Sequence, residues 1–275
     1  MRRKRSLVLQ YNVCLFFYFH FHSHLGYDIT YWKLEGGSPG VIYIQSLFSE
    51  QYKKADALEE YCRREGLSFI RFCLSGTGES EGCLSQSTMT NWLGDSLSIV
   101  RQVAVGPQVL VGSGVGGWLM FLVAMREPES VHSLVGMSCS PDFLQLLWKG
   151  MSEAEKSEAK KKGHFEYFKE GMEAPHQISL ELIQDSARYT ILDMPGLEII
   201  SSPVRLLHGS NDVIMPPSVS VSLVQRLSAP TTFNVVPGGN HSLSREEDLK
   251  LMVEAVEQCV HPVAYEEEED SEDET

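Results

Sequence analysis

A glycine-rich turn between a predicted strand and a predicted helix has the spacing of a site for a catalytic nucleophile. The apolar run 109–111 predicts a buried strand, and residues 118–126 predict a helix. Between them, Gly112 and Gly116 stand two positions either side of Gly114. In a nucleophile elbow, G-x-S-x-G, the flanking glycines let the strand and helix backbones approach each other closely. The nucleophile position therefore falls on Gly114, which has no side chain that could attack a carbonyl carbon.

Ser113 is the alternative nucleophile in this turn. Its flanking positions would be Val111 and Val115, which are β-branched and too bulky for such a sharp turn. Because side chains alternate faces along a strand, Ser113 is also expected to point away from the active centre. A phosphate-binding turn is a weaker interpretation, since the turn has neither the G-x-G-x-x-G spacing nor a Walker lysine. The register is therefore placed on Gly114.

Two residues that could complete a catalytic triad follow later predicted strands. Asp212 comes after the apolar run 204–207, and His241 comes after 232–236. Nucleophile, acid and histidine in this order along the chain are typical of proteins with a nucleophile elbow. In such a triad the acid orients the histidine, and the histidine removes the proton of the nucleophile. We predict that Asp212 and His241 meet at Gly114, with His241 as the general base.

The remaining histidines and the cysteines give no pattern for metal or redox chemistry. His208 and His176 lack the context of the predicted triad and are assigned structural roles. The six cysteines include no C-x-x-C pair and no cluster with histidines at zinc-binding spacing. We therefore expect reduced, mostly buried thiols, no metal and no cofactor.

The elements that must position these residues alternate between strand and helix over residues 28–262. The predicted strands are 40–44, 68–72, 109–111, 131–137, 204–207 and 232–236, and the predicted helices are 53–65, 91–103, 118–126, 219–227 and 245–260. This alternation is typical of an α/β domain, with a mostly parallel sheet covered by helices on both faces.

Residues 141–192 interrupt the alternation. The segment is long, rich in charge and largely helical in its apolar spacing, and no strand is predicted within it. A connection of about 50 residues is too long for a simple loop. We expect a helical lid over the cleft between Gly114 and His241, and an ordinary pair of surface helices is the alternative.

The two ends of the chain differ from the domain in composition. Residues 1–27 contain no Asp or Glu, and four basic residues at 2–5 precede the aromatic-rich stretch 7–21. The basic start suits a mitochondrial presequence, the apolar block suits a secretory signal, and an unstructured extension is a third possibility. The block is short and polar for a membrane span, so stable membrane insertion is not expected. Residues 263–275 are expected to form a disordered acidic tail.

The overall charge argues against one class of partner. The net charge is −14 at pH 7. Eight carboxylates lie within the last ten residues, and the rest of the chain is also acidic. An acidic surface repels phosphate backbones, so nucleic acid is not expected to be a partner.

From about residue 28 to residue 260, the chain resembles the mitochondrial α/β-hydrolases described as palmitoyl-protein thioesterase and mycophenolic acid acyl-glucuronide esterase. The matching runs are Ser38-Pro-Gly-Val-Ile, Ile70-Arg-Phe, Ser75-Gly-x-Gly-x-Ser80, Leu110-Val-Gly-Ser, Gly116-Gly-Trp-Leu-Met120 and Arg205-Leu-Leu-His-Gly209. The resemblance implies the α/β-hydrolase fold, a mitochondrial location and a cofactor-free serine hydrolase. Its implied substrates are acylated proteins, cleaved at the thioesters of their cysteines, and small acyl esters. It places the acid on Asp212, the base on His241 and the nucleophile on Gly114.

The chain departs from this family pattern near the predicted site. After the first buried strand the family has Pro-Gly, where a backbone N–H helps to form the oxyanion hole, and this chain has Gln45-Ser46. The candidate oxyanion donors are therefore Ser46 and Val115. After Arg71-Phe72 the family has Asp, and this chain has Cys73. The acidic tail is also foreign to the family.

Three functions remain open from the sequence. The first is a protein of this family in which hydrolysis is weak or lost because Gly114 replaces the nucleophilic serine. The second is an active hydrolase of thioesters or carboxylic esters, in which Asp212 and His241 activate water. The third is a non-catalytic binding or adaptor protein whose acidic tail docks on basic partners.

Overall fold

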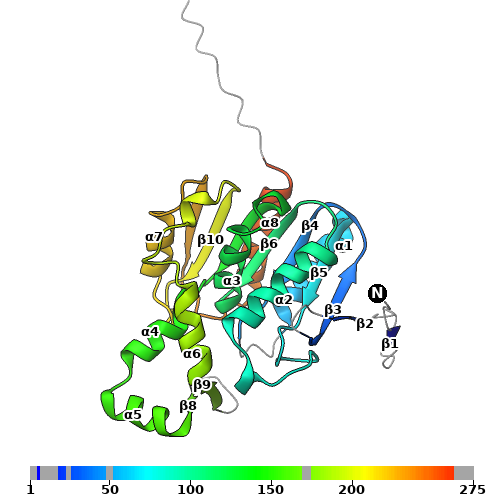
Figure 1. Ribbon diagram of the computed structural model, residues 1–275. Helices are drawn as coiled ribbons and strands as arrows, with labels where there is room; N and C mark the ends of the chain where they lie inside the picture. Colours follow the sequence, from blue (N-terminus) through cyan, green and yellow to red (C-terminus); the bar gives the residue numbers. More distant parts are fainter. Residues whose placement is uncertain (1–4, 7–17, 23–25, 48–51, 169–174, 263–275) are drawn as a thin grey trace, which may run out of the picture.

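The computed structural model describes residues 5–6, 18–22, 26–47, 52–168 and 175–262. A nine-stranded sheet runs through it in the order β1-β2-β3-β5-β4-β6-β7-β10-β11 (Figure 1). The strands are β1 (Arg5–Ser6), β2 (Tyr18–His22), β3 (Asp28–Leu34), β4 (Gly37–Ile44), β5 (Leu67–Phe72), β6 (Gln108–Ser113), β7 (Val131–Met137), β10 (Val204–Gly209) and β11 (Thr231–Val236). From β5 to β11 all neighbours are parallel, and only the pairs involving β1, β2 and β3 are antiparallel. The predicted mostly parallel sheet is thus confirmed.

Helices cover both faces of the sheet, as the alternation predicts. The helices are α1 (Lys53–Glu65), α2 (Met89–Gln102), α3 (Val115–Ala124), α4 (Phe143–Gly150), α5 (Glu153–Lys162), α6 (Leu180–Ser186), α7 (Ser218–Val224) and α8 (Glu246–Val260). Alternate residues of the central strands enter two separate cores. Ile42 and Leu110 pack with α2 and α3 on one face, and Val41 and Val109 pack with α1 and α8 on the other. Central strands buried on both faces explain the continuous apolar runs in the sequence.

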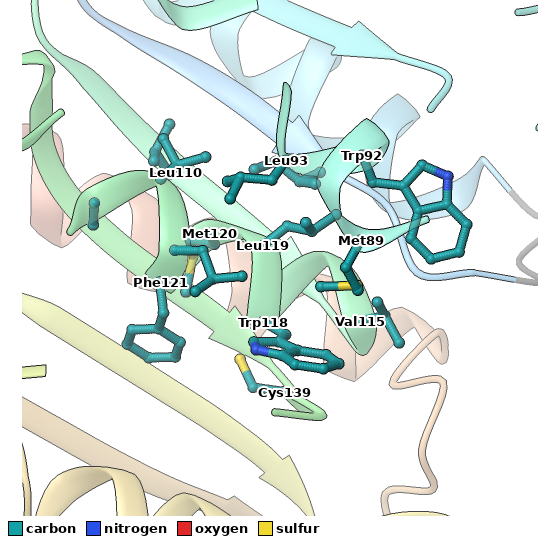
Figure 2. Close-up of a cluster of buried hydrophobic side chains, with 14 of the residues drawn as sticks. Met89, Trp92, Leu93, Leu110, Val115, Trp118, Leu119, Met120, Phe121 and Cys139 are labelled. Carbon is teal, nitrogen blue, oxygen red and sulfur yellow. The ribbon is translucent and has the colours of Figure 1, made fainter. Parts of the chain in front are cut away.

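Helix α3 is the most deeply buried helix of the described part of the chain. All ten of its residues are buried. Figure 2 shows Trp118 and Leu119 of α3 in the same buried cluster as Met89 and Trp92 of α2 and Leu110 of β6. A helix that is apolar on every side must be enclosed on every side, so the position of its first residue is tightly fixed.

The N-terminal edge of the sheet contains three strands that the sequence does not predict, β1, β2 and β3. Tyr18–His22 forms β2, which pairs antiparallel with β3. This part of the segment 1–27 therefore belongs to the sheet. Residues 1–4 and 7–17, which carry most of the targeting hypothesis, and the acidic residues 263–275 lie outside the described residues. Within the described ranges, no helix has the length and apolar content needed to cross a lipid bilayer.

The insertion 141–192 extends beyond one end of the sheet (Figure 1). It contains α4, α5 and α6, and also an antiparallel hairpin of β8 (His164–Tyr167) and β9 (His176–Ser179). The expectation of an insertion without strands is therefore wrong, because strands of four residues are too short to give a clear alternation. The Asp142 carboxylate accepts hydrogen bonds from the N–H groups of Ile191 and Leu192, at 2.8 and 3.0 Å. These bonds hold the two ends of the insertion together.

The close approach of α3 to β4 generates a stability prediction. A Cβ atom on Gly116 would lie 2.1 Å from the carbonyl oxygen of Ile44. Because that oxygen is backbone and cannot rotate away, Gly116→Ala should lower the free energy of unfolding by about 3 kcal/mol. Gly150→Ala is the matched control, because nothing lies within 4 Å of a Cβ there. Urea unfolding of both variants checks this, and equal stabilities would refute the account of the turn.

Candidate active site

The pairing of β4 with β6 brings the region after β4 to the predicted elbow. Ile44 is opposite Gly112 in this parallel pair. Ser46 lies two residues after Ile44, and Gly114 lies two residues after Gly112. The two residues therefore lie side by side at the carboxyl edge of the sheet. The carbonyl oxygen of Gly114 accepts a hydrogen bond from the N–H of Ser140 at 2.9 Å, which fixes the turn against the segment after β7.

Gly114 has the backbone conformation of a strained turn. It is the N-cap of α3, with φ +54° and ψ −122°. A Cβ atom built on Gly114 would lie 3.5 Å from Nε2 of His241, 2.3 Å from Oγ of Ser46 and 3.0 Å from Cβ of Ser46. A side chain at position 114 would therefore point at the imidazole, but the Ser46 side chain already fills that space.

Ser113 faces the opposite side of the sheet. It is buried and makes a side-chain hydrogen bond with Tyr43. Tyr43 belongs to the core that packs against α1 and α8. This orientation follows the strand alternation and keeps the Ser113 hydroxyl away from His241.

Asp212 and His241 lie in direct contact at the ends of β10 and β11. Nδ1 of His241 is 2.7 Å from Oδ2 of Asp212. The other oxygen, Oδ1, accepts the backbone N–H groups of Ile214 and Met215, both at 2.9 Å. The Asp212 side chain is fully buried, whereas the His241 side chain is 20% exposed. This arrangement leaves Nε2 of His241 directed at the elbow as a proton acceptor.

The hydrogen bonds that Asp212 accepts keep its carboxyl group ionised. Burial by itself raises the pKa of this carboxyl group. The hydrogen bonds from His208, His241 and the Met215 backbone outweigh burial and hold the pKa well below its usual range. Asp212 is therefore ionised throughout the neutral range and can stabilise a positive charge on His241.

His208, assigned a structural role from the sequence, also belongs to this hydrogen-bond network. Its Nε2 lies 3.1 Å from Oδ2 of Asp212 and 2.8 Å from the carbonyl oxygen of Met215. Since both partners are acceptors, Nε2 carries the proton, and Nδ1 at 2.8 Å from Oγ of Ser220 can accept the hydroxyl proton. His208 thus orients the same carboxylate oxygen that binds His241. Its place at the end of β10, four residues before Asp212, is the signal that could have revealed it.

The loop that carries His241 rests on a buried lysine of α1. Nζ of Lys54 donates a hydrogen bond to the carbonyl oxygen of Ser242, the residue after His241. Burial lowers the pKa of Lys54 to about 8, although the charge of Asp248 acts in the opposite direction. The position of the imidazole therefore depends on a lysine that is costly to keep charged.

The candidate oxyanion donors lie on either side of the elbow. Val115 is the first residue of α3, and N–H groups of a first helical turn have no partner within the helix. Its N–H, at the positive end of the helix dipole, suits a developing negative charge on oxygen. Ser46, the other candidate donor, places its side chain against Gly114 of the elbow.

A cavity of about 370 Å³ adjoins the elbow. It is lined by residues 45–47, which follow β4, by residues between 74 and 84, which follow β5, and by Tyr52 and His176. Ser46 belongs both to this lining and to the elbow. In the insertion, Tyr167 of β8 has a pKa raised to about 12, by burial and then by the negative charge of Asp212. The β8–β9 hairpin therefore lies against this end of the sheet.

The described residues contain no set of ligands for a metal ion. No group of three or more His, Cys, Asp or Glu residues in them is arranged to hold a metal ion. The described cysteines are all free thiols, and burial raises the pKa of Cys73 and Cys139, near the site, to about 12.

A strand–turn–helix elbow after β6, with an Asp–His pair after β10 and β11, defines this protein as an α/β-hydrolase-fold protein. Mouse alpha/beta hydrolase domain-containing protein 10 superimposes with a TM-score of 0.81 at 30% identity, over 95% of this chain and all of that chain. Est1E from Butyrivibrio proteoclasticus, solved with ferulic acid bound, shares the fold with a TM-score of 0.71 at 19% identity, over 85% and 94% of the two chains.

Sequence comparison gives a narrower assignment. Bovine palmitoyl-protein thioesterase ABHD10, mitochondrial, is 35% identical over 240 residues, which cover 85% of this chain and 76% of the bovine protein. No protein-family model matches the chain. The chain belongs to the ABHD10 family of palmitoyl-protein thioesterases.

The buried lysine generates a prediction about pH. Between pH 8 and 10.5 the unfolded chain binds a proton at Lys54 that the folded chain has lost. Stability from this group therefore rises with pH through that window. The unfolding free energy of wild type minus that of Lys54→Met should increase by on the order of 2 kcal/mol between pH 8 and 10.5. Urea titrations at several pH values measure it, and a flat or falling difference would show that Lys54 is not desolvated.

Proposed function

We propose that this chain is a weak acyl hydrolase of the thioesterase type, in which residue 114 no longer serves as the nucleophile. The observation that supports it is the position of a Cβ on Gly114, 3.5 Å from Nε2 of His241. The site for a nucleophilic side chain faces an assembled acid–base pair, but glycine supplies no hydroxyl. Hydrolysis must then use water or a different side chain.

The magnitude of the loss follows from serine hydrolases in general. Removing the nucleophile of a complete triad costs about 10⁶ in kcat, and roughly 10³ to 10⁴ over water remains from binding and the oxyanion hole. A general base acting alone contributes on the order of 10² to 10⁴. The intact contact of Asp212 with His241 favours this second route, an active but slow hydrolase, over a purely non-catalytic adaptor.

The substrate class rests on the cavity and the relatives. The lining of the cavity combines apolar side chains such as Leu47, Leu74 and Leu84 with polar groups such as Thr77, which suits an acyl chain joined to a polar ester or thioester. The relatives are named mitochondrial palmitoyl-protein thioesterases. We assign the chain the same substrate class, acylated proteins or small acyl esters, and the same mitochondrial location.

Rebuilding the elbow tests the proposal. Gly114→Ser alone should gain little, because the new Cβ would meet Oγ and Cβ of Ser46 at 2.3 and 3.0 Å. The double variant Ser46→Gly/Gly114→Ser should hydrolyse a short acyl thioester at least about 100-fold faster than wild type, since it restores a nucleophile beside an existing base. The assay is steady-state release of the free thiol.

The control adds His241→Ala to the double variant and should abolish the gain. A folded double variant that is no faster than wild type would contradict the proposal, because the remaining machinery would then be unable to use a serine. Wild type already as fast as the double variant would contradict it as well.

A further inference from the structure

We infer that the hydroxyl of Ser46 is the nucleophile that His241 now activates, which would make this chain a serine hydrolase with its nucleophile on the β4 loop instead of the elbow. The inference rests on the proposed function, in which residue 114 is excluded and Asp212 and His241 remain competent. It concerns the identity of the attacking group, which that function leaves open between water and a side chain.

The Ser46 hydroxyl lies at the elbow, close to His241. Oγ of Ser46 lies 2.3 Å from where a Cβ on residue 114 would be, and that point is 3.5 Å from Nε2 of His241. The Ser46 hydroxyl thus occupies the volume that a side chain at the elbow would use. No hydrogen bond joins Ser46 and His241 among those of the described residues, so a change of the Ser46 rotamer is required. Catalytic hydrogen bonds are commonly loose before substrate binds.

The Ser46 hydroxyl is accessible to a substrate in the cavity. Ser46 is half-buried and lines the cavity of about 370 Å³. Ser113, the other serine near the elbow, is buried and bonded to Tyr43 on the opposite face of the sheet. A carbonyl group held in the cavity would therefore meet the Ser46 hydroxyl.

His241 has the protonation state that a general base needs. Nδ1 of His241 lies 2.7 Å from Oδ2 of the ionised Asp212, so Nδ1 carries the proton and Nε2 is the acceptor. This is the tautomer needed to remove a proton from a hydroxyl near position 114.

The reaction then balances without any added cofactor. Oγ of Ser46 bonds to the thioester carbonyl carbon while its proton moves to Nε2 of His241, and the carbonyl electron pair moves to oxygen, facing the N–H of Val115. Collapse breaks the carbon–sulfur bond, and the departing thiolate takes the proton from His241. Water, deprotonated by the same nitrogen, attacks the acyl-Ser46 ester, and the proton returns to Oγ as the carboxylic acid leaves.

Active-site labelling tests the inference. Full-length wild type is treated with a fluorophosphonate, and the adduct is located by peptide mass mapping. The expected result is one adduct on Ser46, absent in Ser46→Ala and formed at least about 100-fold more slowly in His241→Ala. Ser222→Ala is the matched control, because it removes the hydroxyl of an exposed serine of α7 that does not line the cavity, and it should label like wild type. Thioester turnover should fall in parallel with labelling.

The outcomes separate this inference from the proposed function. An unlabelled wild type, an adduct that persists in Ser46→Ala, or turnover that needs His241 but not Ser46 would overturn the inference and leave water as the nucleophile. Labelling of Ser46→Gly/Gly114→Ser at residue 114 would still support the proposed function in each of these cases. A folded double variant that labels nowhere would refute the proposed function itself.

Discussion

The site depends on one small volume between the end of β4 and the start of α3, which a single side chain can fill. The register of β4 against β6 places residues 46 and 114 side by side, and Oγ of Ser46 lies only 2.3 Å from the place of a Cβ on residue 114. The volume cannot expand, because α3 approaches the β4 backbone too closely at Gly116 to admit even a methyl group. Protein interiors are close-packed, so two side chains cannot share this space without displacing one of them. Ser46 and Gly114 are therefore best understood as one coupled feature.

The acid–base part of the site is built independently of that volume. The Asp212 carboxylate accepts hydrogen bonds from His208, His241 and two backbone N–H groups, all supplied by residues 208–241. Removing any one donor would leave the buried carboxylate one hydrogen bond short, which is destabilising. The pair of Asp212 and His241 is thus part of the fold as well as part of the chemistry, and it can persist whatever residue stands at the elbow. Lys54 of α1 also holds the loop that carries His241, through its hydrogen bond to the carbonyl oxygen of Ser242.

The positions of Gly114, Asp212 and His241 could be predicted because each follows an apolar strand and parallel strands end at one edge of a sheet. The position of the Ser46 side chain at the elbow could not be derived in this way. Its sequence position indicates a backbone donor, and only the strand register shows its side chain at the elbow. For His208 the sequence offers one signal, its place near the end of β10 four residues before Asp212, which indicates proximity to Asp212 but not which atoms meet. The β8–β9 hairpin and the strands β1 and β2 were missed because each is short and takes its stability from its neighbours. Strand β3 is longer, but its mixed polar and apolar sequence gives no continuous apolar run.

A double-mutant cycle of unfolding free energies tests the shared volume most directly. The four proteins are wild type, Ser46→Gly, Gly114→Ser and the double variant. A serine at φ +54° is strained by roughly 1–3 kcal/mol in both backgrounds, so this cost cancels in the cycle. Because the two side chains compete for one space, Gly114→Ser should cost at least about 1 kcal/mol more in the wild-type background than in the Ser46→Gly background. Effects that add to within about 0.5 kcal/mol would contradict it.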